Sequence, residues 1–181
     1  LIIMKILCLG HSAYDITTPL ETFPIENTKN RVHERIECGG GPAGNAAYLL
    51  GKWGMDVYIA GVVGNDIYGK RIRDEFRMIG VHTDYLELND ETTTTTSHII
   101  ANKSNGSRTI LTYRPSNQKM TDVDIDIDPD IILIDGQEFE MSMKVIDKYP
   151  DAIVVIDAGR DRKDIKELCY KSDYVVCSKE F

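Results

Sequence analysis

Short runs of apolar residues alternate along this chain with stretches of helical periodicity. The apolar runs, each of which predicts a buried strand, cover residues 4–10, 57–64, 131–134, 153–156 and 174–177. The helical stretches between them cover residues 42–53, 67–79, about 142–148 and about 163–170. Because strands joined by helices pair in parallel, this alternation predicts a doubly wound α/β core.

Two segments do not follow this alternation. Residues 92–101 and 108–113 are rich in β-branched side chains, and Asn105-Gly106 between them predicts a hairpin. Residues 15–38 have no helical period, and residues 32–38 alternate as an exposed strand does. We therefore expect segments at about 15–38 and 96–114 to form a small β-sheet attached to the α/β core.

Composition narrows the class of protein. A chain of 181 residues is long enough for one domain, here residues 1–181, and its net charge of −8 argues against nucleic-acid and membrane-surface partners. No apolar run approaches the roughly 20 residues that span a bilayer, and no signal peptide is visible. Residues 1–3 precede Met4, which we expect to be the natural start.

The four cysteines have no metal-ligand spacing. They are Cys8, Cys38, Cys169 and Cys177, and all except Cys38 fall in segments expected to be core strand or helix. We expect reduced structural thiols and a cytoplasmic protein.

The segment from Cys38 to Ala47 contains most of the functional information. Its glycines let a ligand approach the backbone closely, and Gly39-x-Gly41-x-x-Gly44 matches a dinucleotide fingerprint, with Asp66 further along as the ribose acid. That fingerprint belongs directly after the first core strand, however, and here that strand ends at Gly10 with no second glycine. Pro42 and Asn45 also have no role in a dinucleotide loop, so the match is weak.

The same segment resembles the first signature of the PfkB/ribokinase carbohydrate kinases. The residues that carry the resemblance are Gly40-Gly41-Pro42-Ala43-Gly44-Asn45-Ala46-Ala47, with Gly54 and Gly64 at the family's distances. The resemblance extends to residues 10–15, 64–69, 96–97, 105–110, 157–160 and 176–180, and the lid hairpin is similar to the ketohexokinase/fructokinase-like branch. It implies the N-terminal portion of a ribokinase-like fold, whose small β-sheet is a lid.

The resemblance also implies a set of site residues. Asp15, Gly40, Gly41 and Asn45 would bind the sugar, since together they offer carboxylate, amide and backbone N–H groups to its hydroxyls. Arg114 would contact an acidic sugar or a phosphate, and Gln137 and Glu138 would lie near the phosphates of ATP. Simpler interpretations remain open: a turn or capping carboxylate for Asp15, a helix cap for Asn45, and surface positions for Arg114, Gln137 and Glu138.

The implied reaction transfers the γ-phosphoryl group of ATP to a sugar hydroxyl, with magnesium as the second cofactor. In the family, the base and the phosphate cradle come from a second glycine-rich motif downstream, and this chain ends at Phe181 without it. An Asn-x-x-Glu element near the metal is degraded, with Ser178 and Phe181 at its two positions. We therefore expect no catalytic residue and no metal ligand from this chain, and no sugar phosphorylation by the chain alone.

Two further expectations concern partners and alternatives. Lids of this kind pair between subunits in many relatives, so the resemblance implies a homodimer through the lid. A nucleoside kinase of the same superfamily and a non-catalytic sugar-binding protein remain alternatives.

The alternating aspartates of residues 122–130 lack the Gly and Glu of a calcium loop and indicate a linker. The role of His11 stays open.

Overall fold

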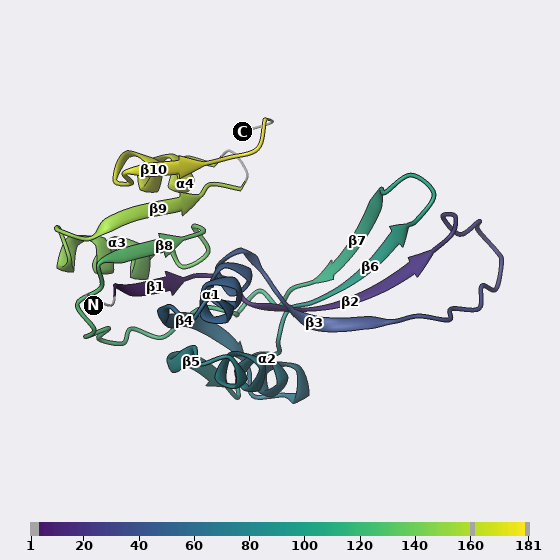
Figure 1. Ribbon diagram of the computed structural model, residues 1–181, viewed down its shortest axis with the longest axis horizontal. Coiled ribbons are helices and arrows are strands. Elements are labelled where there is room, and N and C mark those ends of the chain that lie inside the picture. Colours follow the sequence, from purple (N-terminus) through teal and green to yellow (C-terminus); the bar gives the residue numbers. More distant parts are fainter. Residues whose placement is uncertain (1–3, 160–161, 180–181) are drawn as a thin grey trace.

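The computed structural model describes residues 4–159 and 162–179. Arg160, Glu180, Phe181 and residues 1–3, which entered the sequence interpretation, lie outside the described residues. The molecule consists of an α/β core from which a narrow arm of β-strands extends (Figure 1).

The core contains a six-stranded sheet in the order β10-β9-β8-β1-β4-β5, and every pair of neighbours is parallel. Its strands are β1 (Lys5–Leu9), β4 (Asp56–Gly64), β5 (His82–Asn89), β8 (Ile131–Ile134), β9 (Ile153–Asp157) and β10 (Tyr174–Val176). The helices are α1 (Pro42–Lys52), α2 (Ile67–Met78), α3 (Phe139–Lys148) and α4 (Lys163–Tyr170). This arrangement confirms the parallel α/β core that the sequence predicts.

Alternate side chains of β1 enter two different apolar layers. Ile6 and Cys8 pack with residues of α1 and α2 on one face of the sheet, and Leu7 and Leu9 pack with residues of α3 and α4 on the other. A strand that is covered on both faces reads as a continuous apolar run, which is why β1 is recognisable from the sequence. None of the four described helices is long and apolar enough to cross a membrane.

The arm is a second sheet of four strands in the order β3-β2-β6-β7. These strands are β2 (Ala13–Leu20), β3 (Ile36–Gly40), β6 (Thr96–Asn102) and β7 (Arg108–Tyr113). The hairpin predicted at Asn105-Gly106 joins β6 to β7, and β2 pairs in parallel with β6. The small sheet predicted from about 15–38 and 96–114 is thereby confirmed.

Several elements differ from those that the sequence predicts. Strands β2 and β5 were not predicted, and the strand expected at residues 32–38 is β3 at Ile36–Gly40. Neither β2 nor β5 is apolar throughout, because β2 is mostly half-exposed and β5 is the edge strand of its sheet. Helix α3 starts at Phe139, earlier than expected, and Cys177, expected in a core segment, is exposed beyond β10.

Candidate functional site

The base of the arm lies at the carboxyl end of the core sheet. The chain leaves β1 at Leu9, passes through Gly10, His11 and Ser12, and enters β2 directly. It returns along β3, which ends at Gly40, and Gly41 then leads into α1. The glycine-rich segment therefore joins the arm to the core, at the edge of the sheet where open α/β folds bind ligands.

Asp15 lies within β2, the strand that follows β1 along the chain. It pairs with Cys38 of β3 and with Ser97 of β6 in the ladder. Burial raises the pKa of its carboxyl group, whereas a hydrogen bond from Ser97 and the charge of Arg108 act in the opposite direction. Its position inside a strand contradicts the interpretation of Asp15 as a turn or capping carboxylate.

Gly40 and Gly41 are required by space and by backbone conformation. A Cβ at Gly40 would overlap the Asp15 carboxylate, and a Cβ at Gly41 would overlap the carbonyl oxygen of His11. Gly41 also has φ of 89°, a region that favours glycine. Within the described residues the Gly41 N–H has no recorded hydrogen-bond acceptor, so it can donate to a ligand.

Gly41 is the N-cap of α1, and no side chain caps this helix locally. Asn45 lies a turn further along, where its own amide donates to the Gly41 carbonyl at 2.8 Å and its side chain is exposed. The alternative role of Asn45 as a helix cap is therefore contradicted, and its side chain is left available to a ligand.

Asp135 also belongs to this site, although the sequence did not indicate it. It follows β8 directly, and its Oδ2 accepts hydrogen bonds from the amides of His11 at 2.8 Å and Ala43 at 3.2 Å. Burial raises the pKa of Asp135, the backbone N–H donors oppose that effect, and the charge of Asp157 adds to it. An acid directly after a buried strand was the signal available, but its partners are distant in sequence.

These contacts exclude the dinucleotide interpretation of the glycine segment. A dinucleotide loop presents the free first-turn amides of a helix to the pyrophosphate. Here the Ala43 amide donates to Asp135, and the Gly44 amide donates to the His11 carbonyl at 3.1 Å. A carboxylate already lies where the pyrophosphate would bind, and its negative charge would repel the ligand.

A cavity of 530 Å³ opens beside this helix start, at the carboxyl ends of β1, β8 and β9. Its lining residues are His11, Pro42, Arg114, Asp135, Gln137, Ala158, Gly159, Arg162 and Ile165. Burial, together with the positive charge of Arg114, lowers the pKa of His11 to about 4, so that its ring is neutral at pH 7. Burial also lowers the pKa of Arg114, with Asp135 and Glu138 acting against it and Arg162 adding to it.

Two of the expected site residues line this cavity, and a third does not. Arg114 and Gln137 line the cavity together, and within the described residues no carboxylate lies within ion-pair distance of Arg114. Glu138 is buried and turned elsewhere, because its Oε2 accepts the amide of Met120 at 3.1 Å. Within residues 4–159 and 162–179, no group of three or more acidic, histidine or cysteine side chains could hold a metal ion.

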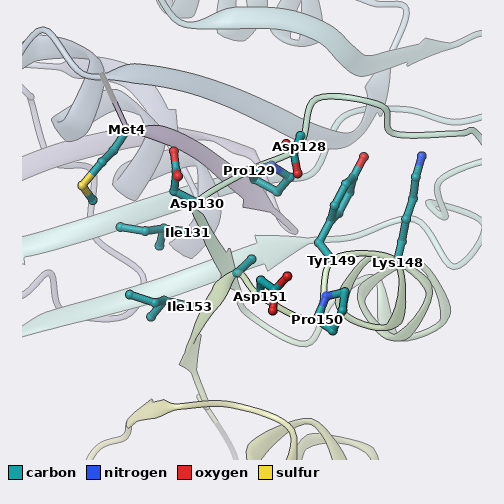
Figure 2. A pocket seen from close by; sticks show the side chains of 11 residues that line it. Met4, Asp128, Pro129, Asp130, Ile131, Lys148, Tyr149, Pro150, Asp151 and Ile153 are labelled. Carbon is teal, nitrogen blue, oxygen red and sulfur yellow. The ribbon is translucent and has the colours of Figure 1, made fainter. Parts of the chain in front are cut away.

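A larger cavity, of 610 Å³, lies at the opposite edge of the core sheet (Figure 2). It is bordered by Ile131 and Ile153, the first residues of β8 and β9, and by the loop around Tyr149 and Pro150. None of the site residues indicated by the sequence lines it. We therefore assign the candidate site to the smaller cavity and the adjoining base of the arm.

Comparisons with known proteins identify a family and several relatives that this chain resembles. A family model described as "pfkB family carbohydrate kinase" matches residues 4–178. A nucleoside kinase from Methanocaldococcus jannaschii is 25% identical over 158 residues, which are 87% of this chain and 52% of that protein. Ketohexokinase from Mus musculus is 30% identical over 109 residues, which are 60% of this chain and 37% of that protein.

A solved structure shows the same fold. Arabidopsis thaliana ribokinase, in complex with ribose and ATP, superposes with a TM-score of 0.78 at 22% identity, covering 97% of this chain and 60% of that one. The chain thus spans about half, or less, of the length of the curated relatives it matches.

Proposed function

This chain belongs to the pfkB family of carbohydrate kinases, and on that premise we propose that it forms the sugar-binding half of an enzyme that transfers the γ-phosphoryl group of ATP to a sugar hydroxyl. The observation that carries the proposal is the close approach of the Asp15 carboxylate to Gly40, the residue before Gly41, whose N–H has no acceptor among the described residues. A carboxylate beside a backbone N–H without an acceptor offers complementary partners to neighbouring hydroxyl groups.

Each site residue has a distinct role in this proposal. Asp15 accepts hydrogen bonds from sugar hydroxyls, the Gly41 amide donates one, and the exposed Asn45 side chain can do both. Arg114 and Gln137 face the phosphates of ATP, or an acidic group of the sugar, from the adjoining cavity. Glu138 would support this wall through its hydrogen bond to Met120 rather than by contact with ATP.

The small sheet acts as a lid over the sugar. Exclusion of water from the site would protect ATP from hydrolysis and strengthen the polar contacts to the sugar. Bound magnesium would neutralise charge on the phosphates; the described residues offer no ligand cluster for it, so we assign it no residue of this chain. We also propose that the catalytic base lies outside residues 1–181.

A nucleoside is the second candidate acceptor. The match to the M. jannaschii nucleoside kinase covers 87% of this chain, whereas the match to the ketohexokinase covers 60% of it. The Arabidopsis ribokinase was solved with ribose, which is also the sugar of a nucleoside. The neutral His11 ring in the cavity wall would suit a planar base, through stacking or a hydrogen bond.

We further propose a homodimer through the lid, in the cytoplasm. The edge strands β3 and β7 expose Ile36, Ile110, Leu111 and Tyr113, which a partner strand would cover. The free thiols of the chain suit a reducing compartment. Replacing Leu111 by Lys should convert the dimer to a monomer in sedimentation equilibrium, whereas the Met78→Lys variant, changed on α2, should stay dimeric.

The decisive test of function is ADP release by the full-length protein against a panel of ketoses, pentoses, sugar acids and nucleosides. Phosphorylation of one class identifies the acceptor. Binding of a sugar by calorimetry without any ADP release would instead indicate a non-catalytic sugar-binding protein. Robust turnover by residues 1–181 alone would contradict our assignment of the base to another part of the protein.

A further inference from the structure

The Asp135 carboxylate joins three segments that are far apart in the sequence. Its Oδ2 accepts the amides of His11 and Ala43, at 2.8 and 3.2 Å, and its Oδ1 accepts the amide of Gln137 at 3.0 Å. A Cβ at Gly10 would overlap this carboxylate, so glycine is needed there for Asp135 to approach the end of β1. Three backbone donors are thus satisfied by one side chain.

Each of these segments contributes to the proposed site. His11 precedes the entry into β2 and Asp15, Ala43 follows Gly41 at the start of α1, and Gln137 lines the cavity. Helix α1 has no local side-chain cap. Asp135, distant by 92 residues, therefore serves as the cap that orients its first turn.

The capping arrangement also sets the electrostatics at this helix start. A carboxylate at the amino end of a helix interacts favourably with the helix dipole. The same charge makes this end of α1 unfavourable for phosphate and favours an uncharged ligand near the Gly41 amide. Anionic groups would then be attracted to the Arg114 side of the cavity.

We propose that Asp135 is the positioning residue of the acceptor site, holding Gly41 and Asn45 in register with Asp15 through the start of α1. This inference rests on the proposed function, because it assumes that these groups bind an acceptor hydroxyl. Asp135 itself contacts backbone amides and need not contact the acceptor.

The test compares Asp135→Asn with Asp130→Asn, a matched control. Asp130 also accepts a backbone amide, that of Lys5 at 2.7 Å, but lies at the opposite end of β8. Amide hydrogen exchange on the folded chain is the first measurement, and acceptor affinity, measured by calorimetry with the sugar or nucleoside found active in the panel, is the second.

We expect Asp135→Asn to accelerate exchange at Ala43 and Gly44 and to weaken acceptor binding at least about tenfold, with the Km for ATP changed less than twofold. Asp130→Asn should change neither the exchange at Ala43 nor acceptor binding. Unchanged exchange at Ala43, or faster exchange with unchanged acceptor affinity, would overturn the inference. If Asp135→Asn does not fold, Asp135→Ser, which keeps one acceptor oxygen, is measured with the same expected outcomes.

Failure of the proposed function gives a different result. In that case the unaltered protein binds none of the sugars and nucleosides tested, so Asp135→Asn cannot lower an acceptor affinity. Exchange at Ala43 then still decides whether Asp135 holds the start of α1.

Discussion

The carboxylate of Asp15 lies against Gly40, in the space that a methyl group on Gly40 would occupy. Gly40→Ala must therefore displace Asp15, while the rest of the β2–β3 ladder can remain paired. We expect a fall in acceptor affinity of about tenfold or more, because small displacements of a binding group are costly. Calorimetry with the active acceptor measures it.

Gly54→Ala is the matched control for this substitution. Gly54 has φ of 76° and no neighbour within 4 Å of an added Cβ, at the far end of α1. The Gly54→Ala substitution should lower the free energy of unfolding by about 1 kcal/mol and leave acceptor binding unchanged. Wild-type affinity in Gly40→Ala would contradict the role of Asp15.

Asp66 links the core to the base of the arm, and its loss should destabilise the fold. Its carboxylate caps α2 through the amides of Tyr68 and Gly69, and it accepts both the amide and the hydroxyl of Thr94 at 2.8 Å. We expect Asp66→Asn to lower the free energy of unfolding at pH 7 by about 1–3 kcal/mol. Urea unfolding measures it, and Asp74→Asn, an exposed change on α2, should cost under about 0.5 kcal/mol.

The same residue predicts a pH dependence. Burial alone would raise the pKa of Asp66, but the hydrogen bonds from Thr94, Gly69 and Tyr68 outweigh it, so the folded-state pKa is lowered. A lowered acid pKa stabilises the fold above the unfolded value of about 3.9, and this contribution is lost as the pH falls through the folded-state pKa. The difference between wild type and Asp66→Asn should therefore shrink between pH 5 and the acid limit; a constant difference would contradict it.

The sequence predicted the parts of the fold that depend on local pattern. Strands β1, β4 and β8 are covered on both faces and read as apolar runs, and the Asn105-Gly106 hairpin depends on two adjacent residues. Strands β2 and β5 were missed because their side chains are only partly buried, with no apolar run to signal a strand.

In the candidate site, too, residues within one local motif could be predicted, whereas residues that act through distant contacts could not. Gly40, Gly41 and Asn45 could be predicted as site residues because one short segment carries them. Asp135 was missed because its role depends on His11 and Ala43, which are 124 and 92 residues away. The sequence predicts Glu138 near the phosphates together with Gln137, but in the structure Glu138 accepts the amide of Met120. Neighbouring residues can face opposite sides, so their order in the sequence does not predict this contact.

His11 should stay neutral through the physiological range. Burial and then the charge of Arg114 lower its pKa to about 4, below the unfolded value of about 6.5. Since the folded state disfavours the protonated ring, stability is complete above pH 6.5 and falls as the pH drops toward 4, by about 1.4 kcal/mol per unit. NMR titration of the His11 ring measures the pKa, and titration near pH 6.5 would contradict the prediction.

Arg114→Gln tests the cause of this shift and the role of the guanidinium together. Removing the positive charge should raise the pKa of His11 and weaken binding of ATP or of an acidic sugar severalfold, while a neutral sugar binds as before. Arg73→Gln, on α2 where Arg73 forms an ion pair with Asp74, is the control and should change none of these. Equal loss of neutral and anionic ligands would indicate a structural role for Arg114.

The thiol of Cys38 should report acceptor binding. Cys38 lies opposite Asp15 in the β2–β3 ladder, where directly paired side chains share one face. Burial, and then the charges of Asp15 and Glu75, raise the pKa of the thiol, so only a small fraction is thiolate at pH 8. We expect iodoacetamide to label Cys38 more slowly than an accessible small-molecule thiol, and a bound acceptor to slow it further.

The exposed Cys177, beyond β10, serves as the internal reference for this labelling experiment. Asp15→Asn removes one of the negative charges that raise the pKa of Cys38, so it should accelerate labelling at Cys38 severalfold without changing the rate at Cys177. The same variant should lose the protection by the acceptor, because the carboxylate that holds its hydroxyls is gone. Protection that persists in Asp15→Asn, or that appears equally at Cys177, would place the acceptor elsewhere in the protein.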